Sequence, residues 1–144
     1  MTTTSTPASV SVLPLIGRLL ISSIFLVSAF GKLMAPAGTI GYIASVGLPL
    51  PILVFAAALA TELVGGALLA LGYRTRLVAV ILALFSVASA LIFHNALADQ
   101  NQLFHFLKNL AMAGGLLQVV AFGGGAFSLD QRHSKVAGTL SSAR

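Results

Sequence analysis

The sequence predicts an all-α protein, an integral membrane four-helix up-down bundle. Of its 144 residues, 58% are hydrophobic and only 8% are charged, and the mean hydropathy is +1.02. A soluble domain carries about 25% charged residues, which keep its surface in contact with water. Lipid requires no such surface, so the composition favours a membrane protein. Four apolar runs of roughly 17–23 residues, joined by short loops, are each long enough to cross a hydrocarbon core of about 30 Å.

The first apolar run covers residues 12–34 and contains two charges, Arg18 and Lys32. It is longer than the roughly 7–15 residues of a signal-peptide core, and no small-residue cleavage site follows, so we interpret it as a spanning helix. Residues 1–11 before it are rich in Thr and Ser and are expected to form a mobile cytoplasmic tail. Residues 35–50 contain too much Gly and Pro to span, but part of them is expected to form a short interfacial helix.

Three further spans are predicted, at residues 51–72, 77–93 and 103–122. The earliest of these begins with proline and ends with glycine, the residues preferred at these two positions of a helix. Three consecutive glycines end the last span. Residues 12–125 therefore form one transmembrane domain, and residues 126–144 are expected to be a cytoplasmic tail.

The distribution of basic residues predicts the orientation. Four spans place both termini and the turn between the second and third spans on one side of the membrane. That side carries Arg74, Arg76, Arg132, Lys135 and Arg144, and the other carries Lys32 and Lys108. The positive-inside rule then puts both termini in the cytoplasm. The basic residues stand singly beside apolar runs, without the aromatic clusters typical of nucleic-acid binding, so no nucleic-acid partner is expected.

Glu62 is the most informative residue, because it lies near the middle of the second span, where an ionised side chain is costly. It is expected to face the bundle interior and to be neutral or paired, with Arg18 or Lys108 as the counter-charge. Lys32 is expected to extend to the interface. One polar cavity open to the outer side is predicted from Glu62 together with Lys32, His94, His105, Lys108 and Asn109. A buried ion pair that merely fixes helix order remains an equal alternative.

Other chemistries find little support. No metal-ligand spacing, nucleophile elbow, phosphate loop or dinucleotide fingerprint occurs, so no metal site is predicted. Haem is disfavoured, because His94 and His105 are more typical of interfacial polar residues than of axial ligands in a built pocket. The chain has no Cys, which excludes thiolate catalysis and iron–sulfur ligation by this polypeptide.

Several short motifs occur together in a specific order. They are Arg18 with Ile24, Phe25 and Leu26; Gly31 and Lys32; Gly47 to Pro49; Glu62 with Gly65 and Gly66; Leu71 to Arg76; Phe93 and His94; Phe106 to Leu110; Gly114 and Gly115; and Ser128 to Asp130 with Arg132. Over residues 14–132 this pattern resembles the DoxX family. The resemblance implies a small four-helix protein of the bacterial inner membrane. The family takes its name from a subunit of a thiosulfate:quinone oxidoreductase, and other members are associated with thiol and oxidative-stress handling.

Two functions are compatible with these features. In one, the chain is at most an oxidoreductase subunit that binds quinone and couples a partner oxidoreductase to the membrane. Glu62 would then carry protons, and His94 or His105 would relay them outward. In the other, the chain is a non-catalytic scaffold or assembly protein whose small-residue faces bind another membrane protein or a second copy in a homo-oligomer. A transporter is less compatible, because no inverted repeat is detectable.

Overall fold

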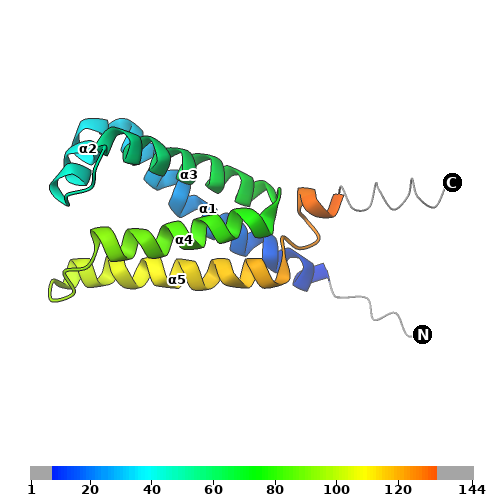
Figure 1. Ribbon diagram of the computed structural model, residues 1–144. Coiled ribbons are helices and arrows are strands. Elements are labelled where there is room, and N and C mark those ends of the chain that lie inside the picture. The colour runs from blue at the N-terminus through cyan, green and yellow to red at the C-terminus, as the bar shows by residue number, and fades with distance from the viewer. Residues whose placement is uncertain (1–7, 133–144) are drawn as a thin grey trace, which may run out of the picture.

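The computed structural model describes residues 8–132. Within this range the chain forms five helices and no strand: α1 (Ala8–Met34), α2 (Pro36–Ser45), α3 (Pro51–Leu71), α4 (Thr75–Phe93) and α5 (Gln100–Phe122). Helices α1, α3, α4 and α5 are long and apolar enough to cross a membrane. The predicted all-α fold with four spans is therefore confirmed. The start of α1, the α3–α4 turn and residues 123–132 lie together at one end of the bundle, which we call the terminal end (Figure 1).

The helix boundaries differ from the predicted ones at the starts of α5 and α1. Helix α5 begins at Gln100 because the carboxylate of Asp99 accepts a hydrogen bond from the backbone N–H of Gln102 at 2.9 Å. Helix α1 begins at Ala8, inside the stretch expected to be a tail, and residues 1–7 of that stretch lie outside the described part. The expected interfacial segment forms α2, whose Tyr42 hydroxyl donates to the carbonyl of Phe93 at 2.9 Å.

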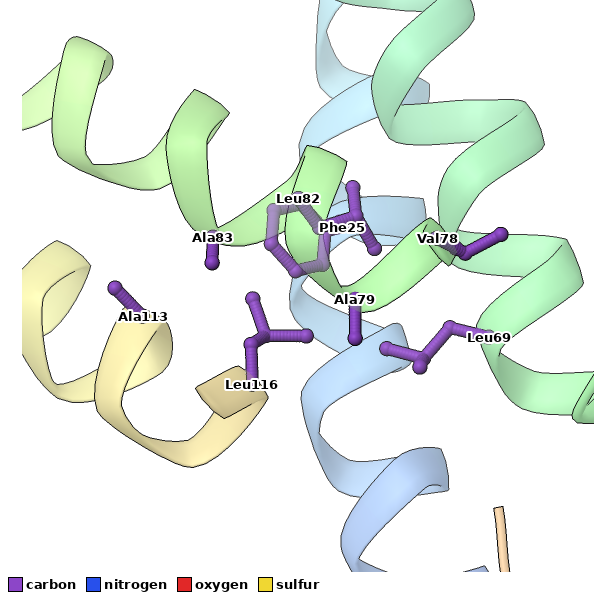
Figure 2. Packing of buried hydrophobic residues seen from close by; sticks show 8 residues of the cluster. All are labelled: Phe25, Leu69, Val78, Ala79, Leu82, Ala83, Ala113 and Leu116. Atoms are coloured by element: carbon purple, nitrogen blue, oxygen red, sulfur yellow. The ribbon is translucent and has the colours of Figure 1, made fainter. Parts of the chain in front are cut away.

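The bundle core is small and is made by residues from all four spanning helices. Figure 2 shows it, with Phe25 from α1, Leu69 from α3, Leu82 from α4 and Leu116 from α5 among its members. Helix α1 packs along α3, helix α4 packs along α5, and α3 joins the two pairs through α4. Most of the large apolar side chains instead face outward, as expected for a surface in contact with lipid.

Two adjacent glycines allow α3 to approach its neighbours closely. A Cβ atom at Gly65 would lie 2.9 Å from Leu82 Cδ2, and one at Gly66 would lie 3.1 Å from Leu26 Cδ2. Small residues at helix contacts are the usual means of close packing in membranes, where no hydrophobic force draws helices together. These glycines are therefore used within the bundle and do not offer a surface to a partner.

Arg18 ties three segments together at the terminal end. Its side chain is buried, and its Nη1 donates to the carbonyls of Leu69 and Ala70, both at 2.9 Å, while Nη2 donates to the carbonyl of Phe127 at 2.7 Å. Carbonyl groups in the last turn of a helix lack partners within the helix, and a cation satisfies them well. Arg18 thus caps α3 and fixes the segment that follows α5.

Asp130 holds the start of α4. Its carboxylate accepts hydrogen bonds from the backbone N–H groups of Arg74 and Thr75 at 2.7 and 2.8 Å and from the Thr75 hydroxyl at 2.6 Å. Its own N–H donates to the carbonyl of Gly72 at 3.0 Å. Residues 126–132, which were expected to belong to a tail, therefore pack against the bundle. Residues 133–144 of the expected tail lie outside the described part.

Replacing Arg18 with leucine removes the three hydrogen bonds that join α1, α3 and residue 127. We expect Arg18→Leu to lower the free energy of unfolding by about 2 kcal/mol, since hydrogen bonds between membrane helices contribute about 0.6 kcal/mol each and three carbonyls each lose a donor. Unfolding in mild detergent, followed by circular dichroism, measures the change. The exposed Arg132 is the matched control, and an equal loss in Arg132→Leu would contradict the assignment.

Candidate functional site

Glu62 is bound by two side chains of α1. The Nζ of Lys32 lies 2.8 Å from Glu62 Oε1, and the Ser28 hydroxyl donates to the same oxygen at 3.0 Å. Lys32 Nζ also donates to Ser28 Oγ at 2.9 Å. Residues four apart on a helix lie on the same face, so Ser28 and Lys32 both reach α3 at the level of Glu62. These three side chains form one hydrogen-bonded group, which we call the Glu62 triad.

The second carboxylate oxygen of Glu62 has no such partner. Glu62 Oε2 is buried and makes no hydrogen bond within residues 8–132. The side chains of Glu62 and Lys32 are 5% and 20% exposed, so the pair is reached from the Lys32 side. An ionised carboxylate accepts several hydrogen bonds, and a protonated one also donates. The triad therefore keeps one buried oxygen that can accept a hydrogen bond from a ligand or carry a proton.

The predicted counter-charge of Glu62 was wrong. Arg18 is directed to backbone carbonyls at the terminal end, and Lys108 Nζ lies 3.2 Å from His105 Nδ1 on its own helix. Lys32 pairs with Glu62 although it was expected to extend to the interface. Its position near the end of α1 suggested that expectation, but its stem is long enough to point back along α1 to Ser28 and across to Glu62.

The remaining predicted residues form a second polar group between the ends of α4 and α5. The rings of His94 and His105 stack with centroids 4.9 Å apart, and His94 Nδ1 lies 2.9 Å from Oε1 of Gln102. The Asn109 amide donates to the carbonyl of His105 at 2.9 Å. We call His94, Gln102, His105, Lys108 and Asn109 the histidine cluster. It lies at the end of the bundle opposite the terminal end (Figure 1).

The structure thus separates the predicted site residues into three groups. Arg18 is at the terminal end, Lys32 and Glu62 belong to the triad, and the others form the histidine cluster. Within the described range, no hydrogen bond or ion pair connects the triad to the histidine cluster, so the seven residues do not form one continuous polar network. Residues 8–132 contain no group of three or more His, Cys, Asp or Glu side chains suited to a metal ion.

Sequence reasoning missed Ser28 and Gln102. A signal for Ser28 was present in the sequence, because Ser28 precedes Lys32 by four residues and the two share a helix face. For Gln102 the signal was weaker. The sequence pattern places the residue in a loop, and only the earlier start of α5 brings its side chain to His94.

The pairing of Lys32 with Glu62 can be tested by a double-mutant cycle. We expect Lys32→Met alone to destabilise the fold, because it leaves Glu62 buried without its counter-charge. Adding Glu62→Gln should recover part of the loss, which gives a coupling energy of about 1–3 kcal/mol. The measurement is the free energy of unfolding in mild detergent.

A second cycle with Lys108→Met and Glu62→Gln serves as the control. It should be additive within about 0.5 kcal/mol, because Lys108 has its own partner on α5. Strong coupling in the control cycle, or none between Lys32 and Glu62, would contradict the pairing.

Comparison with known proteins gives the family. The sequence pattern of the DoxX family matches residues 13–95. Inner membrane protein YphA of Escherichia coli (strain K12) is 36% identical over 126 residues, covering 84% of this chain and 90% of the relative. Inner membrane protein YqjF of the same organism is 32% identical over 124 residues, covering 84% and 92%. No solved structure matches. The chain, a membrane protein with four spanning helices, therefore belongs to the DoxX family.

Proposed function

We propose that this protein is a membrane subunit that binds a quinone, or a similar apolar redox ligand, at the Glu62 triad and couples a partner oxidoreductase to the membrane. The observation that carries this proposal is the unpartnered Oε2 of Glu62 beside the partly exposed Lys32. An ionisable residue inside a membrane is costly, and such residues commonly mark proton or ligand pathways. A pair that only fixed helix order would be expected to use both carboxylate oxygens.

The chemistry of the triad suits a quinone. The Lys32 ammonium can donate a hydrogen bond to a quinone carbonyl, while Glu62 Oε2 takes up or releases a proton. Reduction of a quinone to a quinol consumes two electrons and two protons. Glu62 would deliver the protons one after the other, and the partner would supply the electrons, because this chain has no Cys and no recognisable flavin or nucleotide motif.

The surroundings of the triad support access from lipid. Leu33 and Leu63, the chain neighbours of Lys32 and Glu62, are 44% and 41% exposed, so an isoprenoid tail can lie against apolar side chains beside the triad. The histidine cluster belongs to the same half of the bundle, at the end opposite the terminal end. We assign to His94 and His105 the exchange of protons with the membrane surface, and to Lys108 and Asn109 the positioning of His105.

Quinone bound to the purified protein is the direct test. We expect wild-type protein from mild detergent to carry quinone, detected by lipid extraction and mass spectrometry. Lys32→Met should lower the quinone content about tenfold, because one charge-assisted hydrogen bond is lost. Glu62→Gln should keep quinone but lose quinone reduction with the partner present, because the amide cannot carry a proton.

Arg132→Gln is the control, because this exposed arginine lies at the terminal end, away from the triad. It should retain both quinone and activity. Wild-type protein without quinone, and without quinone reduction in membranes that contain the partner, would refute the proposal.

A second candidate function, non-catalytic assembly, is favoured by one face of α5. Gly114 is exposed, and a Cβ there would meet no atom within 4 Å. Gln118, one turn later, is also exposed on this spanning helix. An amide that faces lipid is more stable when another helix supplies its hydrogen bonds. Three results together would support this function over the first. Wild-type protein would carry no quinone, the Glu62→Gln variant would still bind the partner protein, and the Gly114→Leu variant would not bind it.

We also propose that both termini face the cytoplasm of a bacterial inner membrane. Arg74, Arg76 and Arg132 lie at the terminal end, whereas the opposite half of the bundle carries Lys32 and Lys108. The charge of Lys32 is neutralised by its ion pair with Glu62, so Lys32 adds little positive charge to the opposite side. Basic residues next to spanning helices are retained on the cytoplasmic side.

Reporter fusions test this orientation. Alkaline phosphatase, which is active only outside the cytoplasm, should be inactive when fused to the C-terminus and active when inserted between His94 and Asp99. A fluorescent protein that folds only in the cytoplasm should give the opposite pattern. Activity of the phosphatase at the C-terminus would reverse the assigned orientation.

A further inference from the structure

An open cavity of about 640 Å³ lies at the terminal end of the bundle. Its walls come from the first turn of α4 and from the loop that follows α5, and they include Arg74, Arg76, Leu77, Phe122, Gly123 and Asp130. In Figure 1 this is the region where the start of α4 meets the orange segment after α5. The Glu62 triad is not part of it, so the cavity stands apart from the proposed quinone site.

The cavity is cationic. Arg74 and Arg76 are exposed, and neither guanidinium makes an ion pair within residues 8–132. Asp130 also lines the cavity, but its carboxylate already accepts bonds from the N–H groups of Arg74 and Thr75 and from the Thr75 hydroxyl. The cavity therefore has two positive charges, Arg74 and Arg76, and one negative charge, Asp130. The negative charge is partly compensated by the N–H groups at the N-terminus of α4. The guanidinium groups remain as the donors for a ligand.

The loop after α5 leaves room beside these donors. Gly123 and Gly125 have φ angles of +79° and +77°, a conformation that favours glycine. A Cβ at Gly123 would lie 3.5 Å from Nε of Arg76, so the Arg76 side chain runs along a stretch of bare backbone. A planar guanidinium held in this way can bind two oxygens of a phosphate at once.

The position of the cavity indicates whether a bound phosphate would belong to a lipid or be a free ion. Thr75 begins one span and Phe122 ends another, so the cavity lies where the hydrocarbon core gives way to the headgroups. Leu77 and Phe122, which are 54% and 79% exposed, form its apolar part. A cationic wall next to an apolar one at this depth fits a phosphate with an acyl chain attached better than it fits a free phosphate ion.

We propose that this cavity binds the headgroup phosphate of an anionic phospholipid. Arg74 and Arg76 contact the phosphate oxygens, and Leu77 and Phe122 contact the start of an acyl chain. Basic pockets beside membrane helices are a known way of selecting anionic lipids. Binding would fasten the α3–α4 turn to the loop after α5, two segments that Asp130 and Arg18 already hold together.

Lipid titration of the purified protein tests the proposal. The protein in mild detergent is titrated with phosphatidylglycerol or with phosphatidylcholine, and bound lipid is counted by native mass spectrometry. We expect phosphatidylglycerol to bind more tightly to wild-type protein. The double variant Arg74→Gln and Arg76→Gln should lose about 25-fold in affinity for it, because each arginine contributes about fivefold and the two factors multiply.

Controls separate this cavity from general attraction to positive charge. Arg132→Gln removes an exposed charge at the same end that does not line the cavity, and it should change the affinity less than about twofold. Circular dichroism checks that the double variant is folded. If the double variant unfolds, the single variant Arg76→Gln replaces it, with a loss of about fivefold expected.

Three outcomes would overturn the proposal. Wild-type protein could bind both lipids equally, or Arg132→Gln could lose as much affinity as the double variant. Inorganic phosphate could also displace phosphatidylglycerol at equal concentration, in which case the cavity would be a site for a free anion. The quinone content of the double variant is expected to stay at the wild-type level, so failure here is distinguishable from failure of the quinone proposal.

Discussion

Lipid offers no hydrogen-bonding partner, and this constraint explains where the buried charged side chains of the bundle lie. Arg18 meets it by donating to three backbone carbonyls, two of which belong to the last turn of α3. Glu62 meets it with Lys32 and Ser28. Each of these bonds joins segments far apart in the sequence. The hydrogen bonds that satisfy these buried charges therefore join α1 to α3, and the segment after α5 to both, in addition to the apolar packing of the core.

The same constraint gives the two ends of the bundle different properties. At the terminal end, Arg18 and Asp130 direct their charged groups at backbone atoms, and their bonds fix α1, α3, α4 and the following loop in place. In the opposite half, charged and titratable side chains contact one another, as in the Glu62 triad and the histidine cluster. Bonds to backbone favour a rigid frame. Contacts among titratable groups can rearrange when a proton moves, which is why the proposed chemistry is assigned to this half.

Much of the fold follows from hydropathy, which depends only on local composition and is therefore visible in the sequence. The four spans and the inward position of Glu62 belong to this class. The partner of Glu62 does not, because it depends on how far a lysine side chain reaches between two helices whose relative position is unknown. The packing of the segment after α5 could not be predicted for a similar reason, because Asp130 caps a helix that begins 55 residues earlier in the chain. Long-range polar contacts of this kind leave no periodic signal.

Three buried polar atoms of the described part have no hydrogen-bond partner: Arg18 Nε, Ser22 Oγ and Glu62 Oε2. The three atoms differ in the free-energy penalty of the missing hydrogen bond and in whether a proton or a ligand can take its place. The guanidinium of Arg18 already makes three bonds, so the unpartnered Nε–H adds a limited penalty to a group that is largely satisfied. A serine hydroxyl can rotate to a carbonyl of its own helix, as Ser86 does with Leu82. Glu62 alone combines a titratable group with a neighbour, Lys32, that is reached from outside. A missing bond at Arg18 or Ser22 is therefore a cost of packing, whereas at Glu62 it is a place where a proton or a ligand can be held.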